Sequence, residues 1–354
     1  MNGHRLSRVR ENMAAEGLRC VVVSDPTSIY YLTGVVIDPG ERMLALAIDG
    51  DRTALFANRL FALSGKGLPL VEFGDTDDSV ACLADWLPGG DVGVDKAWPS
   101  GFLMRLMARR PDIRPVQGLG PVDGARMIKD AGELDALRES SRRNDCAMSE
   151  LISALRPGMT ELEACEVYRR AAAGLGAEGM AFEPLICFGA NAAEPHHIPD
   201  GTPLQSGDAA ILDVGLRYRG ALSDMTRTVV FGKASGQLRA LYELVRAANA
   251  AGAAAARPGV RLSDVDGAAR GVIAAAGYGE QFIHRTGHGL GLQVHEPPDV
   301  SATSTVVARP GMVFSIEPGI YLPGQFGVRI EDLVAVIDGG CEVLNRLPRE
   351  LIEI

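Results

Sequence analysis

The first third of the chain alternates between helical and strand-like patterns of apolar residues. Residues 5–17 carry apolar side chains at helical spacing, and Gly17 is placed to end that helix. Asp49-Gly-Asp is a hairpin signal, and Pro26-Thr-Ser is expected to form a turn. Short apolar runs predict three strands, at residues 20–24, 43–48 and 53–56. The pattern therefore predicts a smaller α/β domain over residues 1–122.

A Gly/Pro-rich segment at residues 118–124 ends this pattern, and we place the domain boundary there. Thr160 with Glu163 predicts a capping box at the start of a helix, and Ser263 with Asp266 has the same form. Other helices are expected at residues 132–155, 236–256 and 265–276. Strands are expected at residues 209–216, 226–231, 312–316 and 329–337.

Helix pairs followed by strand hairpins thus occur twice in the second part of the chain. This order predicts an α+β domain over residues 123–354, built from two pseudo-duplicated halves.

Composition excludes some functions. The 354 residues carry a formal net charge of −10, only 5% are aromatic, and no Lys/Arg-rich run occurs, which argues against a nucleic-acid binder. No apolar stretch reaches the ~18 residues of a membrane span, and no signal peptide is recognised at the start. The six cysteines are scattered without a C-x-x-C pair, so we expect them to be reduced and the protein to be cytoplasmic.

Carboxylates stand where the strand pattern should place apolar side chains. Asp213 follows Ala-Ile-Leu in an apolar run, and Asp224 lies eleven residues later, across a predicted hairpin turn at 217–220. Glu317 ends the run Met-Val-Phe-Ser-Ile, and Glu331 lies in the last predicted strand. Four acids in apolar strands are costly unless they are paired, protonated or bound to cations.

Histidines cluster in the same region. Five of the six, namely His196, His197, His284, His288 and His295, fall within 100 residues. With His288 the four acids form an oxygen-rich set with one nitrogen donor, which suits two divalent ions such as Mn²⁺. Any one acid alone is more often a cap or a salt-bridge partner. The segment 287–291 fails the dinucleotide spacing G-x-G-x-x-G, and His295-Glu-Pro-Pro is not the helical H-E-x-x-H motif.

Four sequence blocks carry a family resemblance. They resemble the signature blocks of the metal-dependent pita-bread peptidases, metallopeptidase family M24, in the order Asp, Asp, His, Glu, Glu. The segment Asp25–Gly34 is similar to the creatinase-like N-terminal domain of Xaa-Pro dipeptidases and aminopeptidase P. The four blocks are residues 207–228, 287–297, 316–321 and 328–332.

The resemblance implies a dinuclear metal site. Asp213 would chelate one ion, Asp224 and Glu331 would bridge both, and His288 with Glu317 would complete the second. Mn²⁺ is expected first, with Co²⁺, Zn²⁺ or Fe²⁺ as alternatives. Two ions ~3.5–4 Å apart can share a water and lower its pKa toward ~7, giving a bridging hydroxide.

The resemblance also implies roles on the substrate side. His196 and His295 match the family histidines that line the substrate site, and are expected to stabilise the oxyanion and assist proton transfer. Glu317 could carry a proton to the leaving nitrogen, and Arg329 is expected to orient the metal carboxylates. For His197 and His284 a structural role is at least as well supported.

The implied activity is hydrolysis of the Xaa-Pro bond of short peptides, by a protein that is a homodimer by analogy. Prolidases restricted to dipeptides usually carry an Arg shortly after the second substrate histidine, where this chain has Asp299. That leaves dipeptidase and aminopeptidase P activity both open. The alternatives are a pita-bread C–N hydrolase for a non-peptide small molecule, as in creatinase or ectoine hydrolase, and an inactive binding homologue.

Overall fold

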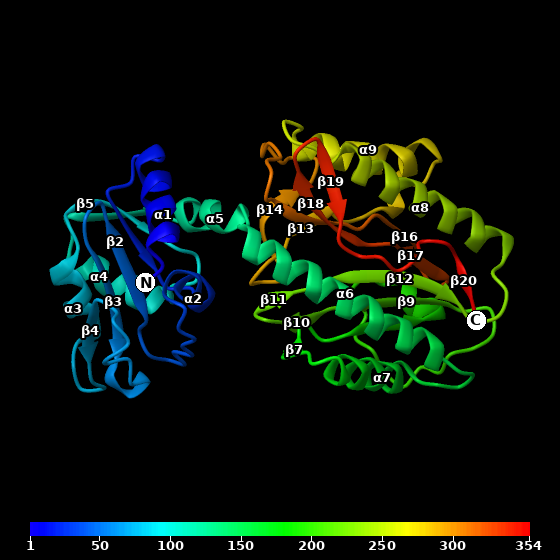
Figure 1. The fold of residues 1–354 in the computed structure, drawn as a ribbon, viewed down its shortest axis with the longest axis horizontal. Helices are drawn as coiled ribbons and strands as arrows, with labels where there is room; N and C mark the ends of the chain where they lie inside the picture. The colour runs from blue at the N-terminus through cyan, green and yellow to red at the C-terminus, as the bar shows by residue number, and fades with distance from the viewer. The chain divides into compact units, whose positions relative to one another are not determined.

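The computed structural model describes residues 1–354 and divides into two units, Met1–Arg126 (unit 1) and Met127–Ile354 (unit 2). Figure 1 labels their helices and strands. Each unit has hydrophobic clusters drawn from its own residues. None of the helices combines the length and the apolar character that crossing a membrane requires.

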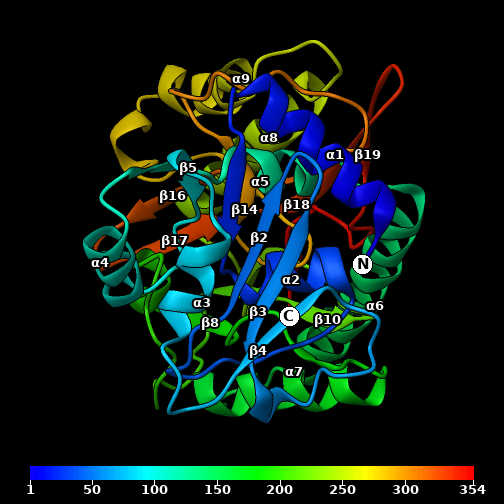
Figure 2. The same cartoon turned by 90° about the vertical axis from the view of Figure 1, so that its left-hand side faces the viewer.

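Unit 1 is built on a six-stranded mixed sheet in the order β4-β3-β2-β1-β5-β6, which faces the viewer in Figure 2. The predicted hairpin is confirmed, because β2 and β3 pair antiparallel around residues 50–52. Helices α3 and α4 pack on the face of the sheet that carries Cys20 and Val22. The strands are β1 (Cys20–Val23), β2 (Ala45–Asp49), β3 (Thr53–Asn58), β4 (Leu70–Phe73), β5 (Gly90–Val94) and β6 (Ile113–Gln117). The helices are α1 (Gly3–Ala15), α2 (Pro26–Thr33), the 3₁₀ helix η1 (Arg59–Phe61), α3 (Ser79–Trp86), α4 (Ser100–Arg109) and α5 (Gly120–Met127).

The turn predicted at Pro26-Thr-Ser is wrong, because these residues open helix α2. Asp25 is the N-cap, and its carboxylate accepts a hydrogen bond from the backbone N–H of Ser28 at 2.8 Å. Pro26 occupies the first helical position, where its missing N–H costs nothing.

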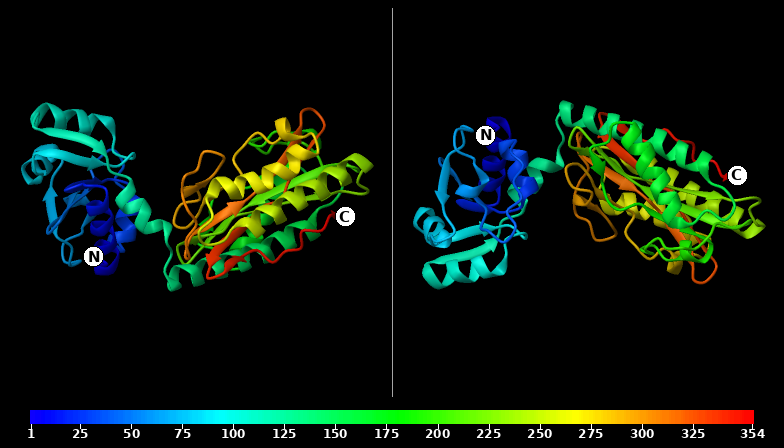
Figure 3. Two further views of the ribbon diagram at one scale, coloured as in Figure 1. Left: turned by 90° about the horizontal axis from the view of Figure 1, so that it is seen from above. Right: turned by 90° about the horizontal axis from the view of Figure 1, so that it is seen from below.

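In unit 2 a pair of helices followed by a set of strands occurs twice, as predicted. Helices α6 (Ala131–Ala154) and α7 (Glu161–Gly174) precede the first set of strands, and helices α8 (Gly236–Ala255) and α9 (Leu262–Ala275) precede the second. Figure 3 shows α8 and α9 in yellow-green and yellow, lying side by side. Two 3₁₀ helices also occur: η2 (Gly189–Ala193) follows the strand at 185–188, and η3 (Gly279–Gln281) follows α9.

The strands of unit 2 form four sheets. The first half has the orders β20-β12-β9-β8 and β11-β10-β7, and the second half has β14-β13-β15-β18-β19 and β16-β17. The first-half strands are β7 (Gly179–Met180), β8 (Leu185–Phe188), β9 (Ala209–Val214), β10 (Leu216–Tyr218), β11 (Ala221–Leu222) and β12 (Met225–Val230), joined by β20 (Ile352–Glu353). The second-half strands are β13 (Gly287–Gly289), β14 (Glu296–Val300), β15 (Val313–Ile316), β16 (Gly319–Leu322), β17 (Phe326–Arg329), β18 (Asp332–Ile337) and β19 (Gly340–Val343).

Of the two predicted capping boxes, one is confirmed and one is wrong. Thr160 and Glu163 form a complete capping box on α7. Helix α9 instead begins after Arg261, which makes no side-chain cap. The buried carboxylate of Asp266 accepts hydrogen bonds from the N–H and hydroxyl of Thr286, so it fixes the segment just before β13 rather than a helix end.

The single strand predicted at residues 329–337 is wrong, because the chain changes sheets within it. β17 pairs with β16, β18 pairs with β15, and Ile330 and Glu331 lie between the two strands. The backbone N–H of Glu331 donates to the carbonyl of Thr226 at 3.1 Å, which ties the break to β12 of the first half.

Candidate metal centre

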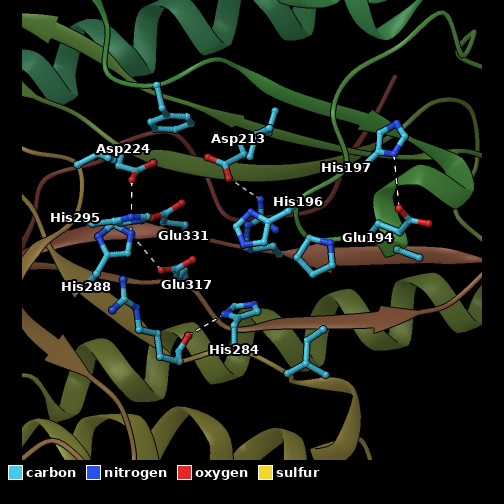
Figure 4. A pocket seen from close by; sticks show the side chains of 18 of the residues that line it. Glu194, His196, His197, Asp213, Asp224, His284, His288, His295, Glu317 and Glu331 are labelled. Carbon is cyan, nitrogen blue, oxygen red and sulfur yellow. Dashed lines mark hydrogen bonds and ion pairs between the residues drawn. The ribbon is translucent and has the colours of Figure 1, made fainter.

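Four carboxylates and one imidazole converge in unit 2 from both halves of the repeat. Asp213 lies on β9, and Asp224 directly precedes β12; these strands pair with Asp213 opposite Thr226. In the second half, His288 lies on β13, Glu317 directly follows β15, and Glu331 lies between β17 and β18. All five line a pocket of about 860 Å³, and Figure 4 shows their side chains pointing into it.

One turn and one close approach of two strands bring these groups together. Arg219 and Gly220 both have positive φ, 51° and 75°, so the predicted turn at 217–220 reverses the chain between β10 and β11. On β13, a Cβ on Gly287 would lie 1.8 Å from the carbonyl oxygen of Ser315. Only glycine therefore allows the approach of β15 that places His288 beside Glu317.

The ligand-type atoms lie close together. One atom each from Asp224, His288 and Glu331 lie within 4.8 Å of one another, and all three residues are buried. Nε2 of His288 is 3.4 Å from Oε1 of Glu317 and 3.8 Å from Oδ2 of Asp224. The structure thus assembles all five predicted metal-ligand residues in one place.

Several carboxylate oxygens in this group are buried without a hydrogen bond. They are Oδ1 of Asp213, Oδ1 of Asp224 and Oε1 of Glu331. Burial first, and the neighbouring carboxylates second, raise the pKa of Asp224 and the pKa of Glu331 well above their usual values. Burial likewise raises the pKa of Glu317 to about 7. As ionised groups these acids need a cation among them.

The imidazole of His288 also presents an unused electron pair to the acids. Its Nδ1 lies 3.2 Å from the carbonyl oxygen of Gly289, so this nitrogen carries the proton and donates. Nε2 is then unprotonated and faces Glu317 and Asp224. Burial lowers the pKa of His288 to about 3, so the ring stays neutral at pH 7. A lone pair aimed at carboxylates is repulsive alone but favourable around a bound metal ion.

Arg329 is the one buried cation at this site. It donates to Oδ2 of Asp213 at 2.6 Å, to the Tyr321 hydroxyl at 2.9 Å and to the Thr226 hydroxyl at 3.1 Å. Thr226 in turn donates to Oε2 of Glu331 at 2.7 Å. One positive charge does not balance four carboxylates, so Arg329 orients the acids without neutralising them.

The two predicted substrate-side histidines lie on the pocket wall and are exposed. His196 follows η2, and His295 directly precedes β14. The rings of His295 and His288 are perpendicular, with centroids 4.1 Å apart. Burial, and then the charge of Arg285, lower the pKa of His295.

The remaining two histidines also line the pocket but contact different groups. His197 approaches acids outside the group, with Nε2 at 3.4 Å from Oε2 of Glu161. His284 lies on the pocket wall, and its Nε2 is 2.9 Å from the hydroxyl of Tyr321. Burial lowers the pKa of His284 to about 4. In both cases the contacts hold the surrounding loops.

Sequence reasoning missed the polar residues that support the acids. Thr226, Ser315 and Tyr321 contact Glu331, Glu317 and Arg329 respectively. A polar residue at a buried position of an apolar strand was the available signal for Thr226 and Ser315. Tyr321 carried no such signal, because a tyrosine is ordinary in a strand.

Taken as a donor set, the five residues fit divalent cations. They supply unsatisfied carboxylate oxygens and one neutral imidazole nitrogen in a buried, negatively charged pocket. Such donors suit Mn²⁺, Co²⁺, Zn²⁺ or Fe²⁺ and carry no thiolate.

Comparisons with known proteins agree with this chemistry. Residues 135–338 match the model of metallopeptidase family M24, and residues 5–128 match that of the creatinase/prolidase N-terminal domain. A probable dipeptidase, PepE, from Mycobacterium bovis is 35% identical, covering 99% of this chain and 96% of that protein.

Solved structures show the same similarity. A dipeptidase from Pyrococcus horikoshii superposes with a TM-score of 0.93 at 35% identity, covering 99% of this chain and 100% of that one. A prolidase from Thermococcus sibiricus superposes with a TM-score of 0.93 at 32% identity, covering 99% and 98%. These matches confirm the predicted two-domain pita-bread architecture.

Proposed function

The chain belongs to metallopeptidase family M24, and from this premise we propose that it hydrolyses the Xaa-Pro bond of short peptides with two divalent metal ions. The observation that carries the proposal is the group of four carboxylates, two buried and two half-buried. Three of them have a buried oxygen without a hydrogen-bond partner, and the free Nε2 of His288 faces the group. Mn²⁺ is the metal we expect first.

The five residues divide between the two ions. Asp213 would hold one ion, Asp224 and Glu331 would bridge the pair, and His288 with Glu317 would complete the second. Bound there, the ions would polarise the scissile carbonyl and lower the pKa of a water.

The protein groups around the ions would handle protons and charge. His196 and His295 are exposed on the pocket wall, where their N–H groups can donate to the scissile carbonyl oxygen as negative charge develops on it. Glu317, which directly follows β15 at the pocket, can take a proton from water and pass it to the proline nitrogen. Arg329 would keep Asp213 in position.

An apolar part of the pocket supports specificity for proline. The wall includes the side chains of Phe182, Leu185, Ile283, Val294 and Pro323. A pyrrolidine ring can bury its methylenes against such a surface. The tertiary amide before proline has no N–H, so recognition must come from such a pocket rather than from backbone pairing.

The test is a rate comparison after metal analysis. Purified protein is stripped with chelator and reloaded with Mn²⁺, the bound metal is counted, and kcat/KM is measured on Ala-Pro, Ala-Pro-Ala and Ala-Ala. We expect two ions per chain and at least ~100-fold faster cleavage of a proline peptide than of Ala-Ala, as a dedicated pocket allows.

Other outcomes assign the alternatives. Two bound ions with no peptide cleavage would point to a C–N hydrolase of non-peptide substrates, such as the creatinase or ectoine-hydrolase type. Failure to bind metal would reject the dinuclear assignment and favour a binding protein.

A further inference from the structure

A fully buried asparagine on α8, Asn249, contacts the segments that carry two of the proposed metal ligands. It lies in a stretch otherwise rich in alanine, and its exposed fraction is 0%. Asparagine is a poor helix former, and burying an amide costs stability unless the amide is hydrogen-bonded. Its Oδ1 is buried without a hydrogen-bond partner. The stability of α8 therefore does not account for an amide at this position, and its role must come from the Nδ2 group.

The Nδ2 group of Asn249 donates two hydrogen bonds to backbone carbonyls. One goes to the carbonyl oxygen of Ile316 at 2.8 Å, and the other goes to that of Ile330 at 3.3 Å. Ile316 directly precedes Glu317, and Ile330 directly precedes Glu331. One side chain thus joins the two segments that carry these acids.

The peptide units before the two glutamates are held on both sides. A peptide unit is planar, so contacts to its carbonyl oxygen and to its N–H together fix its orientation. In the unit before Glu317, the oxygen accepts from Asn249 and the N–H donates to the carbonyl of Thr286 at 2.8 Å. In the unit before Glu331, the oxygen accepts from Asn249 and the N–H donates to the carbonyl of Thr226 at 3.1 Å. The direction in which each glutamate leaves the backbone therefore depends on Asn249.

Close packing of α8 lets this short side chain reach both carbonyls. Gly252 lies one turn after Asn249, and a Cβ on Gly252 would lie 2.8 Å from Cγ2 of Ile316. The absence of a side chain at Gly252 therefore permits the approach of the helix to the end of β15. The side chains of Glu317 and Glu331 extend from this backbone into the pocket (Figure 4).

The first half of unit 2 has a counterpart. Asn144 on α6 is also fully buried, and its Nδ2 donates at 2.9 Å to the carbonyl of Val214, the residue after Asp213. Its Oδ1 accepts from the hydroxyl of Tyr168 at 2.7 Å. The leading helix of each half thus uses an asparagine amide to hold the backbone next to a proposed metal ligand. Its occurrence in both halves of the repeat indicates a common arrangement rather than a chance contact.

We propose that Asn249 is a positioning residue, which holds the backbone before Glu317 and Glu331 and so keeps both carboxylates in place for a pair of divalent ions. This inference rests on the metal centre of the proposed function. The hydrogen bonds of Asn249 reach backbone carbonyls alone, so it acts through the two glutamates. Groups that orient ligands from outside the coordination sphere typically contribute about 10- to 100-fold to metal affinity.

The test measures Mn²⁺ affinity directly. Chelator-stripped protein is titrated calorimetrically with Mn²⁺, and electron paramagnetic resonance of the loaded protein distinguishes a magnetically coupled pair of ions from isolated ions. Two variants lack the amide but differ in shape: Asn249→Leu fills the site with apolar atoms, and Asn249→Ala leaves it partly empty. In both we expect Mn²⁺ affinity to fall by about 10- to 100-fold. The coupled-pair signal should weaken, because Glu317 and Glu331 both belong to the second ion.

Val245→Ala is the matched control on the same face of α8. Val245 is fully buried and lies one turn before Asn249, and its truncation destabilises the helix packing without removing a hydrogen bond to either carbonyl. Urea unfolding of the metal-free proteins measures the stability of each variant. Val245→Ala should lose stability and keep the wild-type affinity for Mn²⁺.

Wild-type affinity in both Asn249 variants would overturn the proposal, as would a loss confined to one of them, because such a loss would come from packing. An equal loss in Val245→Ala would also overturn it. If Asn249→Leu does not fold, Asn249→Ala alone decides. Because the readout is metal binding, a wild type that holds two ions but cleaves no proline peptide would reject the proposed activity and leave this test in place. A wild type that binds no Mn²⁺ would reject both.

Discussion

Asp224 illustrates how one side chain can favour function over stability. It is buried, its Oδ1 accepts no hydrogen bond, and it faces Glu331 and Asp213. The folded-state pKa is raised well above 3.8, so folding favours the protonated acid. Asp224 therefore contributes its full stabilisation of the folded state below pH ~3.8, the usual pKa of the unfolded chain. This contribution is lost as pH rises through the raised folded-state pKa. In metal-free protein the buried carboxylate therefore lowers stability increasingly as pH rises.

We accordingly predict that Asp224→Asn stabilises the metal-free protein at pH 8 by roughly 1–3 kcal/mol, because a neutral amide replaces a buried charge. The same change should abolish binding of the metal pair. Urea unfolding in chelator at pH 6 and pH 8, with metal analysis, checks both; the wild type should be more stable at pH 6, and the variant should show a smaller difference.

His295→Ala is the control, since it alters the same pocket outside the proposed ligand set. It should bind metal normally and show no gain in stability, while kcat falls. Normal metal content in Asp224→Asn would contradict the assignment of Asp224 as a ligand.

At the scale of elements, a buried ion pair fixes the loop that presents His295. Nζ of Lys129 lies 2.9 Å from Oε1 of Glu296, and both side chains are 3% exposed. The other oxygen of Glu296 accepts from the backbone N–H of Gln293 at 3.2 Å. The backbone N–H of Lys129 donates to the carbonyl of Gly311 at 2.8 Å, so the segment before α6 is tied to the second-half sheet.

Removing one partner of this pair should leave a buried, uncompensated carboxylate. We predict that Lys129→Met lowers the free energy of unfolding by about 3–5 kcal/mol, and that Lys129→Met with Glu296→Leu recovers much of the loss. Arg246→Met, which breaks an exposed pair with Glu243, should cost less than about 1 kcal/mol. Comparable losses in Lys129→Met and Arg246→Met, measured by urea unfolding, would show that the buried pair has no special role.

At the scale of the whole molecule, all the proposed metal ligands lie in unit 2, and each of its two halves contributes some of them. Asp213 on β9 and Asp224 just before β12 come from the first half, and the segment from β13 to β18 carries the other three groups. Metal binding should therefore link the two halves of unit 2, while unit 1 keeps a core of its own.

We predict that Mn²⁺ slows amide hydrogen exchange in unit 2 and leaves unit 1 nearly unchanged. At a metal concentration 100 times Kd, the linkage is worth about 2.7 kcal/mol for one site. Exchange measured by mass spectrometry with Mn²⁺ and with chelator should show the gain in peptides covering 209–231 and 286–332. An equal gain over residues 1–126 would mean that the site is not confined to unit 2.

The sequence by itself determined the periodic elements and the identity of the acids, because both are local properties. The Ala-rich stretch at 236–256 predicted α8, and acids such as Asp213 within apolar runs were visible as costly exceptions. The order of motifs was enough to predict the family and the two-domain fold.

Only the tertiary structure decided which polar groups meet. The strand at 329–337 is broken at Glu331 because the chain changes sheets, and Asp266 binds Thr286 instead of capping α9. The sequence showed Asp299 at a position where prolidases usually carry an Arg. In the fold, Oδ1 of Asp299 accepts a hydrogen bond at 2.7 Å from Nη1 of Arg285, a residue fourteen positions away in the sequence. Local patterns record side-chain burial and spacing, whereas the pairing of charges depends on contacts between distant segments that only the folded chain creates.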